Sequence, residues 1–331
     1  MRILDLSTDS LLLPLRSKGI EMVHSPTGQA VMHRAGPRTH PLRMILRLCF
    51  ELLRARRYDW VILPPIHFHS NKGNSWIRSL LKRFLARLMQ HPVLVRFGRR
   101  IVFGGKAQLA VIDYSDWLYP SEFALRCIRP RHYFMGNIPH DLVEQHLGPA
   151  GTLMHYLPTA VKDALIDSLH AQSRGARKYE VFVAGNYHNE QRLKQRKAAE
   201  LLGQRGVKVL ELGEKSFVKY SSGILNSQLC LAGRGLGYHC DRAFEAAAAG
   251  AAPVLHSPEA NTYHDYVHKV NCFLYDPALE PEQIADFVQD ILRDPESIPI
   301  VAEGARRLLE SRHRATVVAD YLYGILMAPI P

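Results

Sequence analysis

The chain has 331 residues and a formal net charge of +11, and 47% of its residues are hydrophobic. This length accommodates two α/β domains with full cores, because a domain commonly holds about 100–200 residues. No apolar run reaches the roughly 18 residues of a transmembrane helix, and the five cysteines show no CxxC spacing. Composition therefore excludes a disordered chain, an integral membrane protein and a disulfide framework, and it favours buried, reduced thiols.

Almost all of the excess positive charge lies in the first half of the chain. Residues 1–150 contain 22 Lys and Arg against 10 Asp and Glu, whereas residues 151–331 contain 20 against 21. Such an asymmetry favours contact between the first half and a polyanion or an anionic membrane.

The first half shows an irregular α/β pattern. Strands are expected at residues 2–6, 60–63, 101–103 and 109–112, and helices at residues 41–56 and 74–89. The opening segment MRILDL has neither the basic start nor the small-residue cleavage site of a signal peptide, so we interpret it as a buried first strand.

Both expected helices of the first half are cationic and amphipathic. Arginine and lysine recur among leucine, isoleucine and phenylalanine in residues 43–57 and again in residues 77–88. Helices of this kind dock on anionic membranes or bind nucleic acid, although a single one is more often a core helix with a solvated basic face. Two of them in one basic region favour peripheral membrane contact over nucleic acid.

Two polar segments follow expected strands of the first half. Asp113 and Asp116 stand directly after the strand at 109–112. A carboxylate there could deprotonate an acceptor hydroxyl, or it could simply form a turn. His67 and His69 follow the strand at 60–63 and could line a cleft. Without a third ligand nearby, they do not indicate a metal site.

From residue 179 onward, short apolar strands alternate with helices, which is typical of a parallel, doubly wound sheet. Strands are expected at residues 179–184, 207–212, 228–232, 251–255 and 272–275. Helices are expected at residues 190–204, 218–226, 241–249, 259–268, 281–292, 298–309 and 315–326. The polar run at 173–178 could be a linker, so a domain boundary is expected between residues 157 and 178.

The most informative stretch is residues 229–276. An apolar strand ends in a loop with Gly233, Gly235 and Gly237, and an alanine-rich helix follows with Arg242 and Glu245 in its opening turns. The backbone N–H groups of such a loop and the helix dipole favour a phosphate. A glutamate one turn in can accept both hydrogen bonds of a vicinal diol. A site for both a phosphate and a diol indicates a nucleotide. The alternatives are that the glycine loop is an ordinary βα turn and that Arg242 and Glu245 form an intrahelical ion pair.

The run RAFEAAAAGAAPVL at residues 242–255 resembles the donor-binding segment of GT-B glycosyltransferases. Together with FVAGNYHNEQR at residues 182–192, it is similar to the spore-maturation-type group. The resemblance extends over residues 179–323. It implies that Glu245 binds the ribose hydroxyls and that Arg242 lies near the phosphates or orients Glu245.

The same resemblance implies roles for other donor-side residues. Gly185 and Asn186 would form a turn at the phosphates, and Arg192 would stabilise the departing diphosphate in place of a metal ion, unless it is an ordinary surface arginine. His256 and Glu259 would face the sugar, although Glu259 could instead cap the following helix.

One position departs from the wider GT-B pattern. Many retaining enzymes carry a second glutamate eight residues before the one that matches Glu245, and Gly237 stands there in this chain. The stereochemical outcome therefore cannot be carried over. A catalytically inactive nucleotide-sugar-binding subunit of an assembly stays an alternative.

We therefore expect an α/β, GT-B architecture of two Rossmann-like doubly wound domains that face a cleft. Residues 1–157 would bind the acceptor, with the C-terminal helix at 315–331 packing back on them, and residues 158–314 would bind the nucleotide-sugar donor. The expected activity transfers a sugar from a UDP-linked donor to a surface glycan or lipid-linked acceptor of the lipopolysaccharide or capsule type. No metal or other cofactor is expected.

The expected location is the cytoplasm, with the inner face of the cytoplasmic membrane as a peripheral site. Nucleic acid or protein is the alternative class of acceptor. A nicotinamide dehydrogenase is disfavoured, because no G-x-G-x-x-G follows the first strand.

Overall fold

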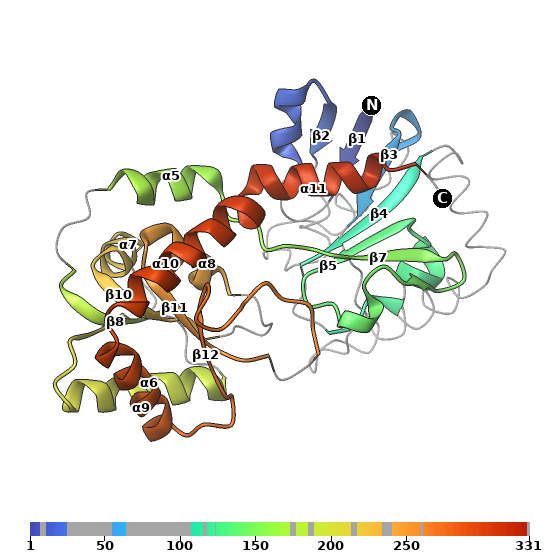
Figure 1. The fold of residues 1–331 in the computed structure, drawn as a ribbon. Coiled ribbons are helices and arrows are strands. Elements are labelled where there is room, and N and C mark those ends of the chain that lie inside the picture. The colour runs from blue at the N-terminus through green and yellow to red at the C-terminus, as the bar shows by residue number, and fades with distance from the viewer. Residues whose placement is uncertain are drawn as a thin grey trace, which may run out of the picture. The chain divides into compact units, whose positions relative to one another are not determined.

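A computed structural model describes most of the chain, in two compact units (Figure 1). Unit 1 comprises Met1–Leu157 with Ala319–Pro331, and unit 2 comprises Pro158–Val318. The structure describes residues 1–6, 11–24, 55–63, 107–114, 118–122, 124–172, 177–184, 189–212, 217–233, 240–258 and 261–329. The strand expected at 101–103 and the cationic helices expected at 41–56 and 74–89 lie outside these ranges, apart from a short 3-10 helix at the end of the first, η2 (Ala55–Arg57).

The described part of unit 1 is built on a seven-stranded sheet in the order β2-β1-β3-β4-β5-β7-β6. Its strands are β1 (Arg2–Asp5), β2 (Glu21–His24), β3 (Trp60–Leu63), β4 (Gln108–Asp113), β5 (His132–Met135), β6 (His146–Leu147) and β7 (Thr152–Tyr156). Neighbouring strands are parallel except for β6 and β7. β3 and β4 are buried almost throughout, which explains why they are continuous apolar runs in the sequence. The short helices η1 (Leu13–Lys18), η3 (Ala124–Ile128) and η4 (His140–Leu142) complete the described connections.

Unit 2 is built on a five-stranded parallel sheet in the order β12-β11-β10-β8-β9. The strands are β8 (Tyr179–Ala184), β9 (Val209–Leu212), β10 (Ser227–Leu231), β11 (Ala252–His256) and β12 (Phe273–Tyr275). The helices are α5 (Asp163–Ala171), α6 (Glu190–Gln204), α7 (Phe217–Leu225), α8 (Asp241–Ala249), α9 (Pro281–Arg293), α10 (Ser297–Leu308), the π-helical turn η5 (Leu309–His313) and the start of α11 (Ala315–Met327), which belongs to unit 1 from Ala319 onward.

The helices of unit 2 cover both faces of its sheet. Phe182 and Ala184 of β8 point into a core shared with α5, α7 and α8, whereas Val181 and Val183 point into a second core shared with α6 and α9. This alternation follows from the two-residue period of a strand. The predicted α/β class and doubly wound sheet are therefore confirmed.

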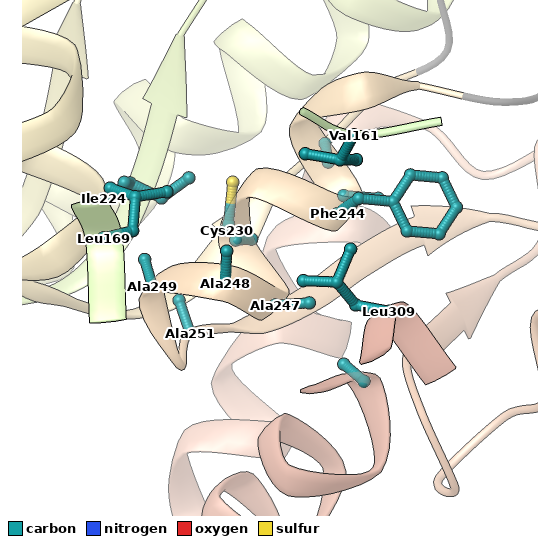
Figure 2. Close-up of a cluster of buried hydrophobic side chains, with 14 of the residues drawn as sticks. Val161, Leu169, Ile224, Cys230, Phe244, Ala247, Ala248, Ala249, Ala251 and Leu309 are labelled. Carbon is teal, nitrogen blue, oxygen red and sulfur yellow. The ribbon is translucent and has the colours of Figure 1, made fainter. Parts of the chain in front are cut away.

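Alanines let helix α8 lie deep in the core of unit 2. Figure 2 shows Ala247, Ala248 and Ala249 in one cluster with Ile224 and Cys230. Gly250 then ends the helix with a φ of 71°, a left-handed conformation that glycine adopts without strain. The chain turns directly into β11, so the sheet sets the C-terminal end of α8.

One predicted helix is wrong, and several described elements were not predicted. Residues 261–267 form an irregular loop where a helix at 259–268 was expected. The Asn271 side chain holds this loop, since it accepts from Val267 N at 2.8 Å and donates to Asp265 O at 2.9 Å. Among the elements that were not predicted are the strands β2, β5, β6 and β7 and the helix α5. Among the described helices, none is long and apolar enough to cross a bilayer.

Candidate functional site

The sheet of unit 2 has its topological switch point between β8 and β10. From β8 the chain first adds β9 on one side and then crosses to β10 on the other. Ligands in doubly wound sheets bind beyond the carboxyl ends of the strands at such a point. The two segments singled out in the sequence leave the sheet here, because residue 185 follows β8 and Gly233 lies just beyond β10.

Several sequence candidates fall outside the described residues. These are His67, His69, Asp116, Gly185, Asn186, Gly235, Gly237 and Glu259. Their assignments stay predictions. The described candidates are Asp113, Arg192, Gly233, Arg242, Glu245 and His256.

Helix α6 places Arg192 near the carboxyl end of β8. Asn189 is the N-cap residue, and its Oδ1 accepts a hydrogen bond of 2.9 Å from the backbone N–H of Arg192. An asparagine at this position satisfies one of the unpaired N–H groups of the first turn. The helix consequently starts at a defined residue, and Arg192 lies half-buried in its first turn.

Gly233 lies against the first turns of α6. A Cβ atom on Gly233 would lie 2.2 Å from Gln195 Oε1 and 3.3 Å from Arg192 Cγ. Gln195 is itself buried, and its Nε2 donates a hydrogen bond of 2.8 Å to the hydroxyl of Tyr275 at the end of β12. The end of β10 therefore meets Arg192 and Gln195, and a side chain on Gly233 would displace the Gln195 amide.

His256 extends the same edge of the sheet. It is the last residue of β11, is almost fully buried and pairs in register with Tyr275. The two ring centroids are 6.2 Å apart. Arg192, Gly233 and His256 thus lie along the carboxyl edge of one sheet, joined through Gln195 and Tyr275. These last two were not candidates, although Gln195 lies three residues after Arg192 on the same helical face.

Glu245 is bound by a tyrosine rather than by the arginine one turn away. Its Oε2 accepts a hydrogen bond of 2.5 Å from the hydroxyl of Tyr220 in α7. Burial raises the pKa of Glu245, and the bond from Tyr220 acts in the opposite direction. Between Arg242 and Glu245 themselves, the structure gives no ion pair. Glu245 is therefore a half-buried carboxylate with one oxygen held in place.

In unit 1, Asp113 belongs to a buried hydrogen-bond network. It ends β4, has an exposed fraction of 0%, and accepts a bond of 2.5 Å from the hydroxyl of Tyr133. That hydroxyl accepts in turn from the backbone N–H of Ser121 at 2.9 Å. Burial and the charge of Asp113 raise the pKa of Tyr133, so the phenol keeps its proton. One carboxylate oxygen of Asp113 is consequently engaged within the protein.

Two further features concern metals and thiols. Within the described ranges, no three His, Cys, Asp or Glu side chains gather as metal ligands.

Cys230, Cys240 and Cys272 are buried free thiols. Burial raises the pKa of Cys230 and Cys240, which keeps both protonated at neutral pH.

Comparisons with known proteins identify the fold. No protein-family model and no curated protein matches the chain. A glycosyltransferase from Rickettsia africae ESF-5 aligns over 98% of this chain and 88% of its own, with 9% identity and a TM-score of 0.54. Anabaena HepE in complex with UDP-glucose aligns over 98% and 99%, with 14% identity and a TM-score of 0.50. A sucrose-phosphate synthase from Thermosynechococcus elongatus aligns over 98% of both chains, with 12% identity and a TM-score of 0.51.

These similar structures are GT-B glycosyltransferases. The chain therefore has the GT-B fold with two Rossmann-like domains, as its sequence predicted. At such low identity the similarity establishes the fold alone, because one fold hosts many functions.

Proposed function

We propose that this protein is a glycosyltransferase that moves a sugar from a nucleotide-sugar to an acceptor hydroxyl. The main support is the arrangement at the switch point of unit 2, where Gly233 lies against the turn of α6 that holds Arg192. Glu245 lies in the helix that follows the glycine loop. A phosphate-binding loop, a cation and a carboxylate are the groups that a nucleoside diphosphate requires.

Each donor-side residue receives one task in this proposal. Glu245 accepts hydrogen bonds from the ribose hydroxyls, with Arg242 beside it. The loop of Gly233, Gly235 and Gly237 binds the phosphates. Arg192, with the turn at Gly185 and Asn186, stabilises the negative charge that develops on the leaving diphosphate, so no metal ion is required for that step.

The base of the donor is uracil in our proposal, because HepE has a similar fold and its structure holds UDP-glucose. His256 and Glu259 contact the sugar. Residues 182–192 and 242–255 support our proposal that the protein belongs to the spore-maturation-type group of these enzymes.

Unit 1 binds the acceptor, which we take to be a glycan on a lipid carrier. The support is the positive charge of residues 1–150, which contain 22 Lys and Arg but only 10 Asp and Glu. Such a region binds the anionic inner face of the cytoplasmic membrane. His67, His69, Asp113 and Asp116 are its acceptor-side candidates. Co-sedimentation with vesicles of anionic and of neutral lipid tests this, and binding that does not depend on lipid charge would contradict it.

Nucleotide binding tests the proposed activity. A ligand that binds only the folded protein raises its melting temperature. We expect UDP, among UDP, GDP, ADP and CMP, to raise the Tm of the wild type but not that of Glu245→Ala. Glu282→Ala is the matched control, because Glu282 is an exposed glutamate in the first turn of α9. The proposal fails if no nucleotide raises the Tm.

A second candidate function is favoured by one residue. Gly237 replaces the second glutamate of many retaining relatives, so the protein could bind a nucleotide-sugar as an inactive subunit of an assembly. UDP binding without release of UDP from UDP-sugars would support this candidate over the enzyme.

A further inference from the structure

The first turns of α6 are tied to the chain at the end of β12 and just beyond it. Gln191 Nε2 donates to a backbone carbonyl that follows β12, at 2.9 Å. Lys194 Nζ pairs with Glu280 Oε1 at 3.0 Å. Gln195 Nε2 donates to the hydroxyl of Tyr275, the last residue of β12, at 2.8 Å. One side of the helix start is therefore fixed to β12 and its continuation.

Arg192 and Gln195 are neighbours at Gly233. Arg192 Cγ and Gln195 Oε1 both lie within 3.3 Å of the point that a Cβ atom of Gly233 would occupy. Because glycine has no side chain, both residues reach the backbone at the end of β10. The Gln195 amide thus lies beside the stem of Arg192, and a shift of the amide would open space next to that stem.

Packing alone does not explain an amide at this position. The exposed fraction of Gln195 is 2%, and the next buried residues of α6 are Ala198, Ala199 and Leu202. An apolar side chain at position 195 would avoid the cost of removing an amide from water. A hydrogen bond has a preferred direction that an apolar contact lacks. The bond to Tyr275 therefore holds the amide in one place against Gly233.

Tyr275 is a firm anchor for this bond. Its exposed fraction is 2%, and its ring lies 6.0 Å from that of Phe287 in α9 and 6.2 Å from that of His256, measured between centroids. Burial raises the pKa of Tyr275, and the bond from Gln195 acts in the opposite direction. The phenol keeps its proton at neutral pH, so it can accept a hydrogen bond from residue 195 or donate one to it.

We infer that Gln195 and Tyr275 are positioning residues that hold Arg192 in place for the diphosphate of the donor. The inference rests on the proposed function, in which Arg192 stabilises the charge on the leaving diphosphate. A cation is most effective there when it is held in advance where the charge develops. The amide and the phenol restrict the arginine stem before the donor binds, which lowers the entropy cost of ordering it.

The test compares UDP with UMP by calorimetric titration of the full chain. UMP lacks the terminal phosphate, so the ratio of its Kd to that of UDP reports the contact with this phosphate. We expect Tyr275→Phe and Gln195→Met to raise the Kd for UDP at least about fivefold, as the loss of one hydrogen bond predicts. The Kd for UMP should stay within about twofold of the wild type. Gln204→Met is the matched control, because Gln204 is an exposed residue at the end of the same helix.

A double-mutant cycle shows whether Tyr275 acts through Arg192. Arg192→Met should itself raise the Kd for UDP more than the Kd for UMP. If Tyr275 only positions the arginine, Tyr275→Phe should change the Kd for UDP by less than about twofold once Arg192 is methionine. Thermal unfolding shows whether each variant is folded. Tyr275→Phe keeps the test available if Gln195→Met is not, because it removes one oxygen and no carbon.

Gln195→Glu tests how near this residue lies to the diphosphate. A carboxylate can accept from the hydroxyl of Tyr275, so the bond is kept. The added negative charge would repel the diphosphate and compete for Arg192, and we expect the Kd for UDP to rise at least about 30-fold. Gln204→Glu makes the same charge change at the far end of α6, about 13 Å along the helix, and should leave the Kd within about twofold.

Three results overturn the inference while leaving the ribose contact of Glu245 intact. The first is a Tyr275→Phe variant in which the Kd values for UDP and UMP change by the same factor or not at all. The second is an undiminished effect of Tyr275→Phe in the Arg192→Met background. The third is a Gln195→Glu variant that binds UDP as the wild type does. If the wild type does not bind UDP, or if Glu245→Ala binds it normally, the proposed function has failed instead.

Discussion

Tyr220 donates a hydrogen bond of 2.5 Å to Oε2 of Glu245, across 25 residues of sequence. The tyrosine is itself held by packing, since its ring makes a T-shaped contact with Phe182 of β8, with centroids 5.4 Å apart. The carboxylate therefore keeps one oxygen in a fixed direction. Because burial raises the pKa of Glu245 and this bond opposes that rise, Tyr220 also favours the ionised form.

Replacing Tyr220 with phenylalanine should weaken nucleotide binding without unfolding the protein. The bond to a charged group contributes about 1.5–3 kcal/mol, and we expect a roughly 10-fold rise in the Kd for UDP. Discrimination between UDP and its 2′-deoxy analogue should fall. The pKa of Glu245 should also rise further, so the loss should grow as the pH falls from 7 to 5.5. Calorimetric titration measures all three effects.

Tyr179→Phe is the control for that substitution. Tyr179 starts β8 and so lies at the amino end of the same sheet, where we expect no effect on UDP. Equal affinities of Tyr220→Phe and wild type for UDP and for 2′-deoxy-UDP would exclude a positioning role for Tyr220.

A methyl group at Gly233 should disrupt the carboxyl edge of β10. It would lie 2.2 Å from Gln195 Oε1, so Gln195 would have to move and lose its bond to Tyr275. We expect Gly233→Ala to destabilise unit 2 by about 1–3 kcal/mol and to weaken UDP binding. Urea unfolding and UDP titration measure the two effects.

Shortening Gln195 provides the internal check on that clash. In a double-mutant cycle, Gln195→Ala should remove most of the additional cost of Gly233→Ala, because the two residues are in contact. Gly203→Ala is the matched control, since nothing lies within 4 Å of the added methyl group and alanine favours the helix. Additive effects of the Gly233 and Gln195 substitutions would contradict the clash.

Local pattern predicted some elements of this fold closely and could not predict others. The helix α6 and the strand β3 begin and end where their sequence patterns indicated. In β5 and β7, His132 and His155 interrupt the apolar pattern, and both are buried because their ring nitrogens pair across the sheet at 2.8 Å. That partner lies 23 residues away, so no short window contains the signal.

The same reason explains why the sequence predicted only part of the candidate site. The glycine loop and Glu245 are adjacent in sequence, so their pattern is visible, whereas Tyr220 reaches Glu245 from a different helix. The predicted helix at 259–268 was wrong because Asn271, outside that window, fixes the backbone at Val267. Local periodicity does not encode such side-chain contacts with the backbone.

The histidine pair of unit 1 should make its stability depend on pH. Burial lowers the pKa of His132 and of His155 to about 4 in each case, and the neighbouring histidine adds to the effect for His132. In the unfolded chain both titrate near 6.5. The folded state therefore binds fewer protons, and stability should be full above about pH 7 and fall as the pH is lowered toward 4.

We expect a loss of up to about 2 kcal/mol per histidine at pH 5. Trp60 can report it, because its ring lies 5.6 Å from that of His132, and urea unfolding followed by tryptophan fluorescence at pH 7.5 and pH 5 measures it. In His155→Gln the free energy of unfolding should differ less between the two pH values than it does in the wild type. The exposed control His140→Gln should show the same difference as the wild type. An equal difference in His155→Gln and wild type would count against the pair.

Arg314 of unit 2 pairs with three carboxylates, so its replacement should destabilise this unit. Its guanidinium donates to Asp163 at 2.7 Å, to Glu310 at 2.8 Å and to Asp167 at 2.5 Å. These carboxylates raise the pKa of Arg314. The network ties α5 to the start of α11, and the backbone joins the same segments, since Val161 N–H donates to His313 O and Ala315 N–H donates to Val161 O.

We expect Arg314→Met to destabilise unit 2 by about 1–3 kcal/mol, between the values for exposed and buried ion pairs. Arg314→Lys should recover only part of this, because an ammonium cannot hold three carboxylates in a planar fork. Arg293→Met is the control, since Arg293 pairs with Asp290 on an exposed face, and it should cost less than about 0.5 kcal/mol. Hydrogen exchange of the α5 amides locates the effect. Full recovery by lysine would mean that charge alone, and not the fork geometry, holds α5 in place.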